Sequence, residues 1–200
     1  MKIALAAIMF MLLFPIRVSA QFWDKVEIFT LYGPTFTKTE VIGGSNVTVY
    51  GAGGYSSTVG LGYLLARKSA VGIWLEMAIP GAMPRNQTAS IPGKISLGSA
   101  MFTSGLRVVV PVQSRISLFV AAGGGTGGFT NADLTSDNPP RLKTKDVAHG
   151  VFDFGGGVDI HIRRFFNLRV DVRDYVTGRD LGGVPCRNQF MPEVGIAFHR

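Results

Sequence analysis

The sequence is poor in charge, in cysteine and in long apolar runs, and each shortage excludes a class of protein. Charged residues make up 16% of its 200 residues, against about 25% in an ordinary soluble domain. The single cysteine, Cys186, excludes an internal disulfide. After residue 20 no run approaches the roughly 18 apolar residues of a membrane helix, although 46% of all residues are hydrophobic. The apolar residues are therefore numerous but dispersed.

Glycine, by contrast, is abundant, with 26 residues. Because glycine destabilises a helix interior by about 1 kcal/mol, this content disfavours a helical bundle. Dispersed apolar residues suit a membrane when they occupy alternate positions of β-strands in a barrel. The chain length fits one domain. The composition therefore predicts an all-β fold.

Residues 1–20 have the three parts of a secretory signal peptide. Lys2 supplies the positive charge, residues 3–16 form the apolar segment, and residues 18–20 (Val-Ser-Ala) form a small-residue cleavage site. The apolar segment is short for a membrane span. We therefore expect a signal peptide at 1–20 and one domain at 21–200, with a retained anchor helix as the alternative.

Eight segments of the remaining chain read as strands separated by turn-forming stretches. The expected strands are residues 26–37, 55–66, 70–80, 95–111, 116–126, 150–162, 167–176 and 190–199. Long connections follow the first, third, fifth and seventh strands, and tight turns follow the others. In an antiparallel up-and-down barrel this order places every long loop at one end, which is the arrangement of outer-membrane barrels.

The two faces of the expected strands differ in kind. Val170 and Val172 share one face of the seventh strand, and Arg169, Asp171 and Arg173 share the other. Across the strands the polar face is mostly glycine with a few charges, which makes a poor water-facing surface. We therefore expect it to line a narrow lumen and the apolar face to contact lipid.

Charges inside a narrow barrel have to pair, because an uncompensated buried ion costs several kcal/mol. We expect a structural ion-pair network in the lumen. Its expected members are Glu27, Glu76, Arg107, Asp153, Asp159, Arg169, Asp171, Arg173 and Glu193. A narrow or gated pore and a catalytic site stay open as alternatives.

Patterns that would indicate catalysis or cofactor binding are weak. His161 shares a face with Asp159 and is the candidate base of a hydrolase, but no recognised motif accompanies it. Gly123, Gly125 and Gly128 match the dinucleotide fingerprint, which also requires a helix that the following residues do not predict. The histidines lack metal-ligand spacing. We expect no catalytic residue, no cofactor, no metal and no enzymatic activity.

Aromatic residues fall near the ends of the expected strands, as girdles at the two membrane interfaces require. Those expected at the loop end are Tyr32, Phe36, Tyr55, Phe129, Phe152, Tyr175 and Phe190, and those at the turn end are Trp23, Tyr63, Phe165, Phe166 and Phe198.

The last strand and the strand layout carry a family resemblance. Phe190, Val194, Ile196 and Phe198 alternate in a pattern similar to the C-terminal assembly signal of outer-membrane barrels, although His199 follows the final aromatic residue. The whole chain after residue 20 resembles the eight-stranded barrels of the OmpA and OmpX type. We expect no C-terminal periplasmic domain.

The expected protein is thus an eight-stranded antiparallel up-and-down transmembrane β-barrel in the bacterial outer membrane. It would serve in membrane integrity, surface interaction or restricted solute passage. Expected partners are outer-membrane lipids, including lipopolysaccharide, and the barrel assembly machinery through the last strand. Scattered basic residues disfavour nucleic-acid binding, and we expect a monomer. The alternatives are a soluble secreted or periplasmic ligand-binding barrel and an outer-membrane lipid-modifying enzyme.

Overall fold

The computed structural model describes residues 25–37, 40–41, 47–49, 53–91, 94–135, 137, 141–177 and 187–199. The strands are β1 (Val26–Thr37), β2 (Glu40–Val41), β3 (Thr48–Val49), β4 (Gly53–Lys68), β5 (Val71–Thr88), β6 (Lys94–Gln113), β7 (Ile116–Leu134), β8 (Leu142–Arg163), β9 (Phe166–Thr177) and β10 (Arg187–His199). Among these residues no helix is long and apolar enough to cross a membrane. The expected signal peptide, Trp23 and Cys186 lie outside the described residues.

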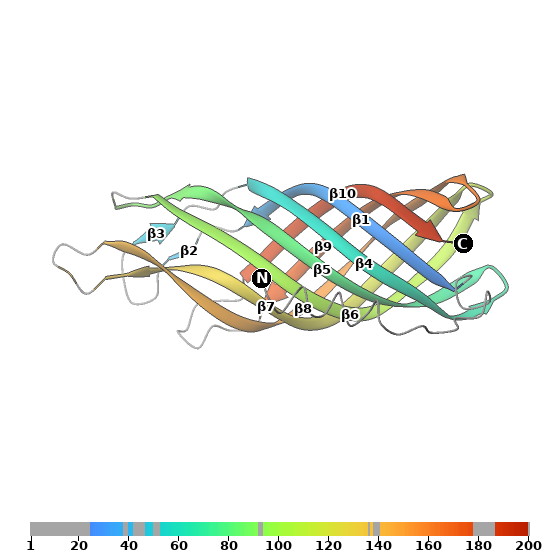
Figure 1. The fold of residues 1–200 in the computed structure, drawn as a ribbon, viewed down its shortest axis with the longest axis horizontal. Helices are drawn as coiled ribbons and strands as arrows, with labels where there is room; N and C mark the ends of the chain where they lie inside the picture. The colour runs from blue at the N-terminus through green and yellow to red at the C-terminus, as the bar shows by residue number, and fades with distance from the viewer. Residues whose placement is uncertain are drawn as a thin grey trace, which may run out of the picture.

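The eight long strands close into one barrel, and β2 and β3 form a separate two-stranded sheet (Figure 1). Every barrel strand is antiparallel to the next along the chain, and β1 pairs with β10 to close the ring, with Ile28 opposite Phe198 and Phe36 opposite Phe190. The prediction of an eight-stranded, antiparallel, up-and-down barrel is confirmed.

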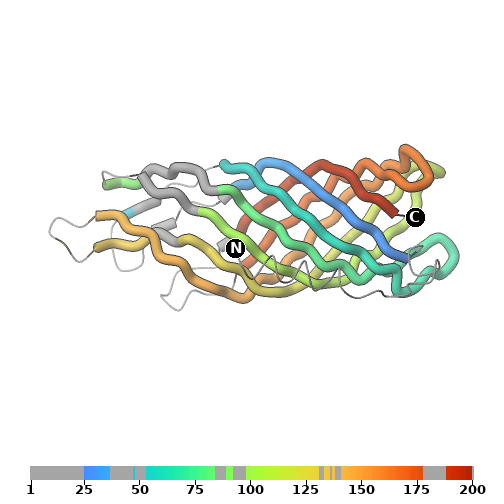
Figure 2. Tube along the Cα trace, in the orientation of Figure 1, coloured from blue at the N-terminus to red at the C-terminus, as the bar shows by residue number. Residues whose placement is uncertain are grey.

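The strands are longer than predicted at the loop end. β5 ends at Thr88 rather than Pro80, and β7 and β8 continue to Leu134 and from Leu142. The expected loops 81–94 and 127–149 are therefore largely hairpin, and Figure 2 shows the β7–β8 extension projecting past the barrel. The reason is that glycine and polar residues interrupt the apolar alternation there, while backbone pairing continues regardless of side-chain polarity.

The outer face of the barrel is apolar, as predicted. On β7, Val120 is 64% exposed, whereas the adjacent Phe119 is buried. Each barrel strand contributes large exposed apolar side chains. Examples in chain order are Ile28, Leu61, Ile79, Leu106, Val120, Phe154, Val170 and Val194. This continuous outward apolar surface matches the lipid-facing band of a membrane barrel.

Two of the aromatic residues expected in the loop-end girdle lie elsewhere. Phe129 and Tyr175 are only 2% and 1% exposed, and both point into the barrel. Their strand positions explain this, because Tyr175 has the same parity as Arg173 and side chains alternate between faces. Tyr32, Phe36, Tyr55, Phe152 and Phe190 are exposed, as a girdle requires.

Candidate functional site

The lumen is centred on three arginines, Arg107 on β6 and Arg169 and Arg173 on β9. Arg107 is fully buried and reaches three other strands. Its Nη2 donates to Glu27 Oε1 at 2.6 Å, and its Nε lies 3.0 Å from Glu76 Oε2. It also forms an ion pair of 3.5 Å with Asp159. One guanidinium thus connects β6 with β1, β5 and β8 across the barrel.

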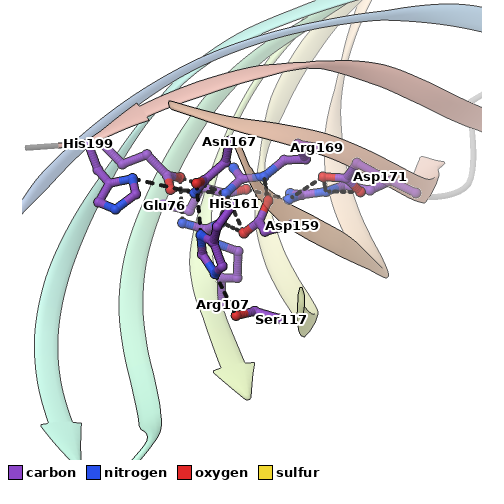
Figure 3. Close-up of polar contacts among 11 residues, drawn as sticks. Glu76, Arg107, Ser117, Asp159, His161, Asn167, Arg169, Asp171 and His199 are labelled. Atoms are coloured by element: carbon purple, nitrogen blue, oxygen red, sulfur yellow. Dashed lines mark hydrogen bonds and ion pairs between the residues drawn. The ribbon is translucent and has the colours of Figure 1, made fainter. Parts of the chain in front are cut away.

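Arg169 and Arg173 extend this network along β9. Arg169 Nε donates to Asp159 Oδ1 at 2.7 Å, and its Nη2 lies 2.9 Å from Glu27 Oε1. Arg173 forms ion pairs with Glu76, with Asp171 at 3.0 Å and with Asp153 at 3.2 Å. Figure 3 shows Arg169 and Asp171 of this network together with Glu76, Arg107 and Asp159. Charge-assisted hydrogen bonds of this kind are roughly twice as strong as neutral ones.

Aromatic rings enclose the two innermost guanidinium groups. Arg169 Cζ lies 5.1 Å from the Phe29 ring centre and 5.2 Å from that of Phe119. Phe119 also lies 5.5 Å from Arg107 Cζ, and Trp74 lies 5.3 Å from it. Cations at these distances are attracted by the ring faces, more strongly when water is excluded. The charges are therefore balanced by carboxylates and by ring faces.

The structure places all nine residues expected in the lumen network in the interior. Eight of them take part in ion pairs. Glu193 is in none of the ion pairs among the described residues, and it lies buried on β10 opposite Asp171 of β9. The network holds six carboxyl groups and three guanidinium groups.

A buried apolar cluster fills the lumen on the loop side of this network. We call it the apolar plug, and it consists of Met101, Phe129, Val151, Tyr175 and Met191. Residue composition did not predict this cluster, but the alternation of side chains between the two faces of a strand could have. Met191 has the parity of Glu193, as Tyr175 has that of Arg173, so both had to face inward.

The turn end of the lumen has a different character. A cavity of about 310 Å³ is lined there by Trp74, Arg107 and four hydrogen-bonded residues from four strands. These four are Ser117, His161, Asn167 and His199.

These four residues form a chain of contacts, which Figure 3 shows running from Ser117 at the bottom through His161 to Asn167 and His199. Ser117 Oγ lies 3.0 Å from His161 Nε2, and His161 Nδ1 lies 2.8 Å from Asn167 Oδ1. Asn167 Nδ2 is 3.4 Å from His199 Nδ1. His161, the candidate base that shares a strand face with Asp159, has Ser117 and Asn167 as its hydrogen-bond partners.

Comparisons with known proteins place this fold. No protein-family model matches the sequence, and no curated protein matches it. Among solved structures, Neisserial surface protein A aligns with a TM-score of 0.60 at 11% identity, over 88% of this chain and 97% of that one. The outer membrane protease OmpT from Escherichia coli aligns with a TM-score of 0.50 at 9% identity, over 89% of this chain and 97% of that one.

At these identities the likeness concerns the fold. The closed antiparallel barrel with an outward apolar band is the fold of outer-membrane β-barrel proteins, and this chain has that fold. Within that class it is an eight-stranded up-and-down barrel with a charged lumen. The prediction of an outer-membrane barrel fold is thus confirmed, and the apolar outer face argues against the soluble ligand-binding barrel.

Proposed function

We propose that the protein is a closed, non-conducting barrel that stabilises the outer membrane and presents a surface hairpin, and that its charged network is structural. The filled lumen is the observation that carries this proposal. The space between Glu76, Asp153 and Arg173 amounts to about 10 Å³, roughly the volume that one water needs. The apolar plug lies next to it on the loop side. Solute passage is therefore the least supported of the three expected roles.

Conductance in planar bilayers tests this proposal. Protein refolded in detergent is first checked for the heat-dependent gel shift of a folded barrel and is then reconstituted. We expect no single-channel steps, because a hydrated ion has no continuous path through the network and the plug. Stable, voltage-independent channels from the folded wild-type protein would overturn the proposal.

The outward-facing surfaces of the barrel are compatible with membrane lipid, lipopolysaccharide and the assembly machinery as partners. The apolar band fits membrane lipid, and the extended β7–β8 hairpin carries Lys143 and Lys145, which suit lipopolysaccharide phosphates. Strand β10 offers the assembly machinery an alternating apolar face that ends at Phe198. The closed ring leaves no open sheet edge between β1 and β10, which favours a monomer.

A second candidate function, hydrolysis of a small ester, is favoured by one observation at the turn end. If His161 Nδ1–H donates to Asn167 Oδ1, then His161 Nε2 is unprotonated and accepts the Ser117 hydroxyl proton. This is the order of roles in a nucleophile–histidine–amide triad. Ser117 Oγ would attack the ester carbonyl as its proton moves to His161, which then protonates the departing alcohol. Water would release the acid and restore the serine.

A covalent serine probe separates the two candidates. If the hydrolase reading holds, a fluorophosphonate labels folded wild-type protein, Ser117→Ala and His161→Ala abolish labelling, and Ser114→Ala in the adjacent turn does not. If the structural reading holds, no variant is labelled, and folded His161→Ala keeps every property of the wild type.

A further inference from the structure

The turn end of the barrel carries a ring of cations, and no acidic side chain is exposed beside them among the described residues. We call it the cationic turn ring, and it consists of Lys25, Arg67, Lys68, Arg115, Arg163 and Arg164. All six are exposed, and together they occupy all three tight turns and the start of β1. The segments 63–71, 111–117 and 162–167 contain no Asp or Glu. The described turn-end surface therefore has six positive side chains and no exposed negative one.

Backbone contacts hold these turns in a fixed relation to their neighbours. Lys25 O accepts a hydrogen bond of 2.8 Å from Leu64 N, and Arg115 O accepts one of 2.8 Å from His161 N. His199 N donates to Phe165 O at 3.3 Å. Figure 1 shows the β4–β5 and β8–β9 turns at the same end of the barrel as the end of β10. The six cations are thus presented by a rigid rim.

No ion pair among the described residues includes a member of the cationic turn ring. Among the described residues, the carboxylates of Glu27 and Asp159 line the turn-end cavity inside the lumen and are paired with Arg107 and Arg169. At the loop end, by contrast, Lys143 lies 3.4 Å from Asp133. Among the described residues the turn-end cations have no exposed counter-charge and repel one another, and such a surface attracts anions.

The depth of the ring identifies the kind of anion. Each turn places a cation within three residues of an apolar side chain that faces lipid, as Leu65 does before Arg67 and Val112 before Arg115. Arg164 Cζ lies 5.3 Å from the ring centre of Phe165, which is 48% exposed. Aromatic residues mark the headgroup level of a membrane barrel. The cations therefore lie beside lipid phosphates rather than free in the aqueous phase.

We propose that the cationic turn ring binds the phosphate groups of anionic phospholipids in the leaflet that faces the turns. This goes beyond the proposed function, because it gives the barrel a preference for anionic lipids. Binding at the turn end would also fix the depth and tilt of the barrel in the membrane. The attraction per basic residue near an anionic surface corresponds to about fivefold in binding, the equivalent of about 1 kcal/mol. It decays within a Debye length of about 8 Å at physiological salt.

Lipid retention tests this directly. The folded protein is reconstituted in nanodiscs with equal amounts of phosphatidylglycerol and phosphatidylcholine of identical chains, and the lipids it retains are identified by native mass spectrometry. At low salt we expect wild-type protein to retain at least ten times as much phosphatidylglycerol as phosphatidylcholine. At 0.5 M salt this ratio should fall strongly, because the Debye length is then about 4 Å.

Two matched triple variants locate the effect. Arg115→Gln with Arg163→Gln and Arg164→Gln removes three turn-end charges. Arg141→Gln with Lys143→Gln and Lys145→Gln removes three loop-end charges and gives the same net charge. We expect the first to lose the preference at least tenfold and the second to keep it. Arg→Lys at the three turn positions should also keep it, which separates charge from folding.

Three outcomes would overturn the proposal. Equal losses in the two Gln triples would mean that overall charge governs retention. Equal retention of both lipids by wild-type protein would mean that the ring has no lipid preference. Displacement of phosphatidylglycerol by inorganic phosphate or by soluble poly-glutamate at the same charge concentration would mean that the partner is a soluble anion.

Discussion

The guanidinium group of Arg169 contacts carboxylates at its N–H groups and aromatic rings on its faces. Carboxylates of Glu27 and Asp159 accept its hydrogen bonds, while Phe29 and Phe119 lie against the guanidinium plane. The same two carboxylates also pair with Arg107, so two buried arginines together balance their charge. Removing Arg169 leaves buried negative charge, which costs far more than breaking an ion pair in water.

Substitution of Arg169 measures this dependence. We expect Arg169→Met to lower the free energy of unfolding by about 3 kcal/mol or more. Lys143→Met, which breaks the exposed ion pair with Asp133, should cost at most about 1 kcal/mol. Urea unfolding in detergent micelles, followed by tryptophan fluorescence, gives both values. Equal small effects would mean that the Arg169 pairs contribute no more than surface pairs.

Two glycines of β8 provide a second comparison at the residue scale. A Cβ at Gly157 would lie 2.7 Å from Phe119 Cζ and 2.0 Å from Val170 O, whereas one at Gly150 would meet nothing within 4 Å. Overpacking typically costs about 1–3 kcal/mol, so Gly157→Ala should destabilise the barrel by that amount. Gly150→Ala should be neutral or slightly stabilising in the same unfolding assay. A neutral Gly157→Ala would show that Phe119 has room to move.

Strand parity predicted which residues face the lumen, but not which of them meet. Glu27 and Arg107 are 80 positions apart and lie on non-adjacent strands, so only the closed ring brings them within 2.6 Å. Alternation reports the face of a strand and not its register around a barrel. The Ser117–His161–Asn167 contacts escaped prediction for the same reason. The apolar plug was not predicted either. The position of Phe129 and Tyr175 near strand ends indicates an aromatic girdle, whereas their strand parity places them in the lumen.

The β7–β8 hairpin is the element that departs furthest from its predicted form. Backbone pairing runs without a register shift from Ile116 opposite Ile160 to Leu134 opposite Leu142. Thr130 Oγ1 also donates to Asp146 Oδ1 at 3.0 Å across the extension. The polar composition of this segment predicted a loop. Alternation of apolar and polar residues reveals a strand only where one of its faces is buried, and this extension has no core to pack against.

Limited proteolysis tests whether the extension is a firm hairpin. Ala148 pairs with Gly128 at its base, and a proline there removes a backbone N–H and restricts the preceding residue. We expect trypsin to spare wild-type protein and Ala148→Val after Lys143 and Lys145 and to cleave Ala148→Pro rapidly. The barrel of all three should keep its heat-dependent gel shift. Equal cleavage of wild-type protein would mean that the extension opens readily.

At the scale of the whole molecule, closure of the ring sets the stability in detergent. The β1–β10 pairing leaves every barrel strand hydrogen-bonded on both sides within the membrane region. The barrel therefore has no unpaired strand edge at which detergent could start to unfold it. We expect folded protein to migrate differently in SDS gels with and without boiling. Identical migration after refolding in detergent would contradict a closed barrel.

Topology is tested by thiol labelling in a Cys186→Ser background. A cysteine at Ser69, in the β4–β5 turn, should react with a membrane-impermeant maleimide only after the outer membrane is broken. A cysteine at Asp137, exposed beyond the β7–β8 hairpin, should react on intact cells. Cys186 lies outside the described residues; its position between the last two expected strands places it in a long loop, so we expect wild-type protein to be labelled on intact cells. The reverse pattern would mean that the barrel is inserted upside down.

The cavity at the turn end is lined by Arg107, and the apolar plug lies on the opposite side of the arginine network. If the lumen is closed as we propose, solvent in this cavity exchanges with the turn side alone. Widening the cavity would then enlarge it without creating a channel. A conducting variant would have to lose both the arginine network and the plug, so we expect single substitutions in either one to leave the barrel closed.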